Sequence, residues 1–348
     1  MTLEIFWFCL ICVLWTGYFV TEGFDFGVGM LLPVLGKSED DRRTMFQTIG
    51  PVWDGNEVWL VIAGGATFAA FPVWYATMFS GFYLALLMIL VLLIVRVLSF
   101  EWRGKAHGPG WKSIWAWLNT LGSVGAPLLW GIALASLLNG VPIASDQGFA
   151  GSFGDLFSAY TILAGIAVCL LFALHGATFL TLRTLGDLRE RARRAAATLA
   201  PLAALVGAGF LVWTLVVASD RNDKGLFPGI VPVAVAAIAA IAAVLLVRAG
   251  NERWAFAATA TTIVAVVVTL FVSLYPRVMV SDPEFGNSLT VDNASSADYT
   301  LTVMTVVAAV LVPLILLYQA WTYHVFRARL GGDDAGSPVD LLARKTGG

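Results

Sequence analysis

The feature that most constrains this chain is a series of apolar stretches, each long enough to cross a lipid bilayer. A membrane-spanning helix needs about 20 mainly apolar residues. Hydrophobic residues make up 59% of the 348 residues and charged residues only 13%, which is too few charges to cover the surface of a soluble protein of this length. The sequence therefore predicts an all-α, polytopic integral membrane protein. Its nine candidate spans are residues 5–35, 45–71, 74–99, 113–139, 156–182, 196–218, 227–247, 254–275 and 299–326.

The spans are predicted to form one transmembrane domain over residues 1–330, followed by a disordered cytoplasmic tail at 331–348. Only Pro72 and Val73 separate the second and third spans, which predicts a tight turn between antiparallel helices. The sixth and seventh spans consist mostly of small apolar residues and are expected to be peripheral packing helices. No basic residue precedes Lys37, so the first span is expected to be an uncleaved helix rather than a signal peptide.

The distribution of Lys and Arg predicts the orientation, because loops on the cytoplasmic side carry an excess of both. The loops on one side hold only Arg221, Lys224 and Arg277. The loops on the other side, with the C-terminal segment, hold Lys37, Arg42, Arg43, Arg103, Lys105, Lys112, Arg183, Arg189, Arg191, Arg193, Arg194, Arg248, Arg253, Arg327, Arg329, Arg344 and Lys345. The C-terminus is therefore predicted to be cytoplasmic and, with nine spans, the N-terminus lies outside.

Cofactor and nucleic-acid chemistry find little support in the sequence. The net charge of −2 gives no reason to expect nucleic acid as a partner. Cys9 and Cys12 lie in an apolar helix without the context of a thioredoxin or zinc site. Among the histidines, only His175 lies well inside a span, where a lone histidine is more often a hydrogen-bonded structural residue than a metal ligand. The sequence therefore predicts no metal site in this chain.

Five ionisable residues interrupt the spans, and such residues usually mark ion or proton paths or pair with one another. Glu22 and Asp25 share one face of the first helix, since they are three residues apart. Asp54 and Glu57 lie at the start of the second predicted span, and Arg96 lies in the third. Counted inward from the nearest loop or helix start at about 1.5 Å per residue, Asp25 is ~18 Å deep, Asp54 ~15 Å and Arg96 ~10 Å. These residues are therefore expected to converge in the cytoplasmic half of the membrane.

Two interpretations of this convergence remain open. The first is a structural network in which Arg96 pins helices together by pairing with carboxylates, a task suited to the guanidinium group. The second is a proton route from the cytoplasm, favoured because the acids outnumber the single base and so provide exchangeable protons. A proton-coupled secondary transporter could use the same acids. It would show broken helices at matching places in two repeats, and no such pairing is evident.

Several of these motifs resemble subunit II of the cytochrome bd-type quinol oxidases. The resemblance rests on GFDFGVGMLLP at residues 23–33, the W-D-G-N string within residues 50–83, the arginine-bearing VRVLSFEWR, HGATFLTLRTLGDL at 175–188 and the N-A-S-S segment within 274–301. It extends from the N-terminus to about residue 330. One departure is Glu57, where the family pattern carries glutamine.

The resemblance implies a bacterial terminal oxidase in the cell membrane that oxidises a membrane quinol, reduces O2 to water and takes the protons from the cytoplasm. It implies that two haems b and one haem d belong to a partner, subunit I. Subunit II itself would be haem-free and built as two four-helix bundles plus one peripheral helix. A small single-span accessory subunit accompanies many such complexes.

The resemblance also implies roles for individual residues. Asp54 would deliver protons toward the oxygen-reducing haem, with Asp25 as a second relay or its partner and Glu57 as either a relay or a partner of Arg96. In the structural interpretation drawn from the residues themselves, Glu22 and Arg96 would form an ion pair. A non-reacting quinone would lie near Arg96, and Trp59 would lie near an oxygen route.

Overall fold

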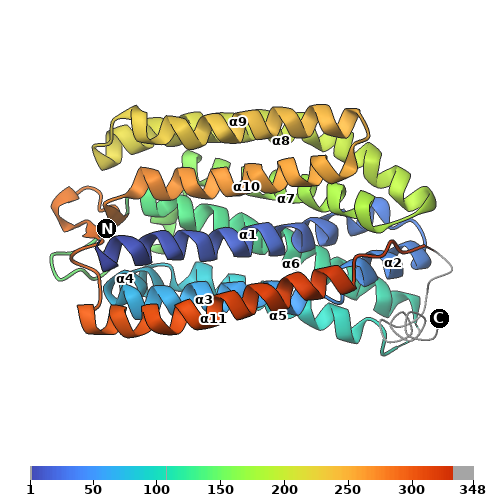
Figure 1. Ribbon diagram of the computed structural model, residues 1–348, viewed down its shortest axis with the longest axis horizontal. Helices are drawn as coiled ribbons and strands as arrows, with labels where there is room; N and C mark the ends of the chain where they lie inside the picture. Colours follow the sequence, from blue (N-terminus) through green and yellow to red (C-terminus); the bar gives the residue numbers. More distant parts are fainter. Residues whose placement is uncertain (1, 107, 332–348) are drawn as a thin grey trace.

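The computed structural model describes residues 2–106 and 108–331, and the predicted tail lies outside this range except for Gly331. The described chain is almost entirely helical (Figure 1). Eight of its helices are long and apolar enough to cross a bilayer, or nine if α3 and α4 together count as one span. The helices are α1 (Leu3–Leu35), α2 (Glu39–Ile49), α3 (Trp53–Ala70), α4 (Pro72–Gly81), α5 (Tyr83–Trp102), α6 (Pro109–Asn139), α7 (Ala159–Arg183), α8 (Gly186–Asn222), α9 (Leu226–Arg248), α10 (Glu252–Leu274) and α11 (Asp298–Val325).

The predicted second span, 45–71, is wrong at its start. Residues 45–49 belong to α2, a separate polar helix capped by Ser38, whose hydroxyl accepts from the amide of Asp41. The chain leaves helical geometry at Val52, next to Pro51, which has no amide hydrogen to donate to a helix. Helix α3 therefore begins at Trp53, and the predicted position of Asp54 ten residues inside a helix is wrong.

Helix α2 is anchored by Asp41, which joins it to α8. Its Oδ1 lies 2.7 Å from Nη2 of Arg191, and its Oδ2 accepts from the amide of Ser38 at 3.0 Å. Partial burial acts to raise the pKa of Asp41, but the Ser38 amide and the Arg191 guanidinium outweigh it and hold the pKa below its ordinary value of 3.8. The ionised carboxylate therefore stabilises the folded chain.

The predicted direct turn at residues 72–73 is also wrong. Pro72 is the first residue of α4, a short helix bent by 119° from α3. Phe71 has φ −132° and ψ 69°, outside the helical region, as expected for a residue that precedes proline. Proline is well tolerated at the first position of a helix. The chain therefore makes a second short helix before α5. Helix α5 begins at Tyr83, nine residues after the predicted start of the third span.

Helix α1 is the centre of the molecule and packs against α3, α6, α7 and α10. Its contact with α7 is close because Gly27 faces Gly176, and a Cβ on Gly27 would lie 1.9 Å from the carbonyl oxygen of Phe172. Small residues allow such approaches between membrane helices. Helices α8 and α9 lie along one edge of the molecule and α11 along the opposite edge (Figure 1). Gly186 starts α8, so the basic segment after α7, predicted as a loop, is helical.

Two long loops pack together: the first connects α6 to α7 and the second connects α10 to α11. The second loop contains a short antiparallel pair, β1 (Arg277–Met279) and β2 (Leu289–Thr290), with the 3₁₀ turn η2 (Phe285–Asn287) between them. The first loop contains the 3₁₀ turn η1 (Phe153–Leu156). Val141 donates its amide to Val280, joining the loops. Ser296 donates its amide and its hydroxyl to the last carbonyls of α3, so the N-A-S-S segment caps that helix.

Candidate functional site

The candidate site is a buried cluster of charged residues between α1, α3 and α5. Arg96 is fully buried, and its Nη1 is paired with Oε1 of Glu22, which is also fully buried. The same nitrogen lies 3.7 Å from Oε1 of Glu57. The guanidinium carbon lies 4.6 Å from the centre of the Phe26 ring, a cation–π distance. Glu22 is thus the nearest carboxylate partner of Arg96, and Glu57 is the second.

A hydrogen-bonded chain runs from α11 through α3 to Asp25 of α1. Tyr323 donates its hydroxyl to Oδ1 of Asn56 at 2.6 Å, and Nδ2 of Asn56 donates to Oδ2 of Asp25 at 2.7 Å. Gln319 also donates to Oδ1 of Asn56, at 3.2 Å. Asn56 and Asp25 are fully buried. Glu22 and Asp25 share a face of α1, so this chain ends beside the ion pair.

The cluster contains more polar atoms than its hydrogen bonds use. Among the described residues, Oε2 of Glu22 and Oδ1 of Asp25 are buried without a hydrogen-bond partner, and so are Nε and Nη2 of Arg96. Three carboxyl groups (Glu22, Asp25 and Glu57) surround one guanidinium. Buried charges without partners are costly, and the contacts within the cluster do not compensate all of these acids.

Asp54 lies apart from this cluster. It is in the first turn of α3 with its side chain exposed, and the described part of the chain gives it no hydrogen bond or ion pair. Glu57 is one turn further along the same helix, with 21% of its side chain exposed. The predicted convergence therefore holds for Asp25 and Arg96 but not for Asp54, which faces outward from this chain.

Trp59 lies between the cluster and α11. Its indole Nε1 donates to Oε1 of Gln319 at 2.7 Å, and its ring covers Gly17, where an added Cβ would lie 2.4 Å from ring carbons. The indole is buried. Trp59 therefore supports the same polar side chain of α11 that binds Asn56.

Sequence reasoning missed Gln319 and Tyr323 as members of the site. Both lie in an otherwise apolar stretch of the last span, four residues apart, and residues at that spacing share one face of a helix. This pair of polar residues was a usable signal for a helix face directed at a polar partner. Its partner, Asn56, could not be identified without the fold because it is more than 260 residues away along the chain.

His175 is a structural residue in this fold. Its Nδ1 lies 2.7 Å from the hydroxyl of Thr259, and its Nε2 lies 3.2 Å from the carbonyl oxygen of Val20. Its ring stacks on Phe256. An axial haem ligand needs a free ring nitrogen, so His175 does not fit that role. Over residues 2–106 and 108–331, no group of three or more His, Cys, Asp or Glu residues could hold a metal ion.

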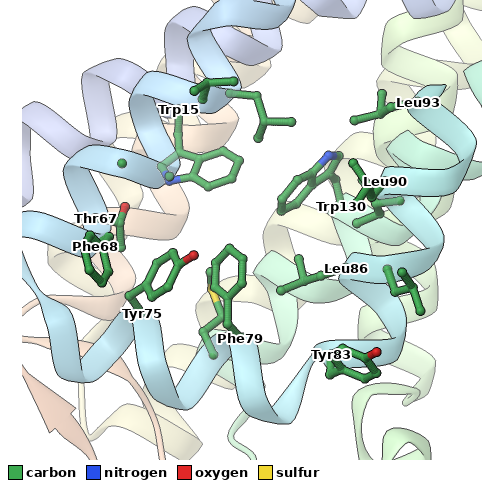
Figure 2. Close-up of a pocket in the computed structure, with 17 residues that line it drawn as sticks. Trp15, Thr67, Phe68, Tyr75, Phe79, Tyr83, Leu86, Leu90, Leu93 and Trp130 are labelled. Carbon is green, nitrogen blue, oxygen red and sulfur yellow. The ribbon is translucent and has the colours of Figure 1, made fainter. Parts of the chain in front are cut away.

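A second feature is an apolar cavity of about 500 Å³ bounded by α1, α3, α4, α5 and α6. Figure 2 shows aromatic rings of Trp15, Tyr75, Phe79 and Trp130 around it. Nε1 of Trp130 is buried without a hydrogen-bond partner. Leu93 lines the cavity and lies three residues before Arg96 on α5. The cavity is therefore suited to an apolar ligand with a polar group near the charged cluster.

Fold and site together define a helical membrane subunit with a buried carboxylate–guanidinium cluster. The family model described as cytochrome bd terminal oxidase subunit II matches residues 3–326. The chain therefore belongs to the cytochrome bd terminal oxidase subunit II family, which confirms the resemblance inferred from its motifs.

Relatives and a solved structure agree with this assignment. The chain is 41% identical to cytochrome bd ubiquinol oxidase subunit 2 of Bacillus subtilis over 93% of this chain and 96% of that protein. It is 37% identical to cytochrome bd-I ubiquinol oxidase subunit 2 of Escherichia coli K12 over 95% of this chain and 96% of that protein. The structure of bd oxidase from Geobacillus thermodenitrificans matches with a TM-score of 0.72 at 19% identity, covering 93% of this chain and 98% of that chain. The solved structure supports the fold, and the transporter alternative is not favoured.

Proposed function

We propose that this chain is the haem-free subunit of a quinol:oxygen oxidoreductase and that it lines a proton path from the cytoplasm. The observation that carries the proposal is the hydrogen-bonded chain from Tyr323 through Asn56 to Asp25, beside the Arg96–Glu22 pair. Hydrogen-bonded polar side chains inside a membrane protein are typical of proton relays. In the complete complex, quinol oxidation would release protons outside while O2 reduction takes them from the cytoplasm, so turnover would be electrogenic.

Each acid has a distinct part in this proposal. Asp54 is exposed in the first turn of α3 and would exchange protons with water or with a group on the partner subunit. Glu57 lies one turn further along α3 and within 3.7 Å of Arg96, so it could pass a proton between Asp54 and the cluster. Asp25 and Glu22 would hold protons at the inner end, and Arg96 would limit how many they hold by stabilising their ionised forms.

The partner in this proposal is the haem-bearing subunit I, with two haems b and one haem d. A carboxylate exposed to lipid is costly, so the exposed position of Asp54 supports the proposal that a partner subunit covers this face of α3. A single-span accessory subunit would complete some complexes. The chain would be arranged as two four-helix bundles, α1, α3, α5 and α6 and then α7–α10, with α11 outside, in a bacterial cell membrane. The excess of Lys and Arg supports a cytoplasmic C-terminus and an outside N-terminus.

We also propose that the apolar cavity of Figure 2 holds a non-reacting quinone as a structural ligand. The apolar lining would accommodate the isoprenoid chain. The unpartnered indole of Trp130 could donate to a quinone carbonyl, and Leu93 brings the cavity to within one turn of Arg96. Trp59 keeps its proposed position near an oxygen route.

The substitution Asp54→Asn tests the proton path. Quinol-dependent oxygen uptake by the purified complex should fall strongly while the haem spectrum and assembly are retained. The reason is that an amide, unlike a carboxyl group, does not take up and release a proton near neutral pH. Asp40→Asn, which removes an exposed acid of α2, is the matched control and should leave uptake unchanged. Normal uptake by a fully assembled Asp54→Asn complex would rule out the proposed path.

A further inference from the structure

A second cavity, of about 660 Å³, lies where α7 and α11 end and α10 begins, next to α2. Four arginines line it: Arg183, Arg253, Arg327 and Arg329. No carboxylate is among the described residues that line it. The rest of the wall is largely apolar and includes Phe179, Leu182 and Phe326. We refer to this space as the arginine cavity.

The arginines retain donors for a ligand. Arg183 donates Nη1 to the carbonyl of Ala328 at 2.6 Å, and Arg329 donates Nη2 to Glu252 at 2.8 Å. Nη1 of Arg327 lies 2.8 Å from Nδ1 of His324. Each guanidinium has five N–H donors, so these contacts leave most of them free.

Arg253 makes no hydrogen bond or ion pair with the described residues, and its side chain is exposed. Glu252 pairs with Arg329 of the cavity at 2.8 Å and is shared with Arg189 at the same distance. Its single charge therefore offsets only part of the charge of the four guanidinium groups that surround the cavity. Like charges gathered in one place repel each other, and a ligand with several anionic oxygens would relieve this repulsion.

We propose that the arginine cavity binds a phosphate group, and that the phosphate belongs to the headgroup of an anionic phospholipid. Guanidinium groups match the geometry of phosphate oxygens. Basic pockets between membrane helices on the cytoplasmic side are suited to acidic lipid headgroups. The apolar wall, with Phe179 and Phe326, would contact the first part of an acyl chain, which a free phosphate would not need.

This site would also fasten the end of α11. That helix has few contacts with the rest of the chain, chiefly with α1 and α3, and it carries Tyr323, which both lines the cavity and binds Asn56. A phosphate that bridges Arg253 of α10 and Arg327 after α11 would hold the two ends together. The inference therefore concerns assembly and is independent of whether protons move through Asp54.

The general excess of basic residues on this side does not account for the cavity. Arg194 on α8 and Arg248 at the end of α9 belong to the same basic set, but neither lines the cavity. They provide a matched control, because replacing them removes the same charge from the same side of the molecule.

The experiment compares phospholipid binding by three forms of the purified complex: the native sequence, Arg253→Gln/Arg327→Gln and Arg194→Gln/Arg248→Gln. Haem spectra verify that each complex is assembled. Native mass spectrometry in mild detergent then measures binding as each complex is titrated with phosphatidylglycerol, with phosphatidylcholine or with inorganic phosphate. Two arginines near the membrane surface predict a loss of affinity for phosphatidylglycerol of roughly 10- to 30-fold in the cavity variant. The control variant should bind like the native complex.

Each outcome has a definite meaning. Unchanged phosphatidylglycerol binding by the cavity variant would overturn the proposal, and so would an equal loss in the control variant, which would indicate surface charge alone. Equal binding of phosphatidylcholine and phosphatidylglycerol would also overturn it. Inorganic phosphate that occupies the site as tightly as the anionic lipid would keep the phosphate site but assign it to a free anion.

Discussion

Removing Arg96 should destabilise the complex strongly, because the guanidinium offsets buried acids. The side chains of Arg96 and Glu22 are both 0% exposed, so Arg96→Met leaves a carboxylate uncompensated in a low-dielectric interior. Removing one partner of a buried pair in this way costs about 3–5 kcal/mol. Replacing both partners, in Glu22→Gln/Arg96→Met, also removes the carboxylate nearest to the guanidinium and should recover part of that loss, although Glu57, 3.7 Å from Arg96 in the native chain, still loses its cation.

The free energy of unfolding can be compared among these variants by titrating the assembled complex with SDS in mixed micelles, followed by haem absorbance. Asp25 and Glu57 remain near the altered site, so the loss in Arg96→Met should shrink as the pH is lowered and protonation removes the uncompensated charge. The reasoning is refuted if Arg96→Met unfolds at the same SDS fraction as the native complex. It is also refuted if the double variant is less stable than Arg96→Met by the full cost of Glu22→Gln.

Three further predictions follow from single contacts. Gly27→Leu should prevent assembly, since its Cβ would meet a carbonyl of α7 at 1.9 Å, whereas Gly209→Leu, with open space around it, should leave the yield of haem-containing complex unchanged. Asp41→Asn should lower the free energy of unfolding by about 1 kcal/mol. Because the pKa of Asp41 is lowered on folding, this loss of stability should be complete above pH 3.8 and vanish as the pH falls through the folded pKa. SDS titrations at several pH values measure it. Tyr323→Phe removes the donor to Asn56 and should slow oxygen uptake several-fold while costing only about 1 kcal/mol of stability; uptake at the native rate would exclude the hydroxyl from the path.

The helical membrane fold was predictable because length and hydrophobicity alone decide whether a segment can span a bilayer. The helix ends near the site were not predicted correctly. Pro51 and Pro72 were visible in the sequence, but the apolar character continues across Pro72, and hydropathy does not register a change of direction. The bend of 119° after α3 follows from the geometry that Pro72 imposes on Phe71.

The charged residues of the cluster could be identified from the sequence, but their arrangement and their polar neighbours on α11 could not. Intramembrane acids and an arginine stand out in any apolar sequence, and helical spacing places Glu22 and Asp25 on one face. Which helices become neighbours depends on packing, and the close contact of α1 with α7 through glycines shows this plainly. The outward direction of Asp54 and the participation of Tyr323 both depend on such neighbours, so neither followed from the sequence.

The measurement that tests the central proposal most directly is the movement of charge across the membrane as the reduced complex in proteoliposomes reacts with O2. Comparison of the native complex with Asp54→Asn and Asp40→Asn separates a proton path from a scaffold. If protons arrive from the cytoplasmic side as proposed, we expect the charge movement that they cause to be lost in Asp54→Asn and intact in Asp40→Asn. An Asp54→Asn complex with native haem spectra and unchanged charge movement would contradict the proposed path.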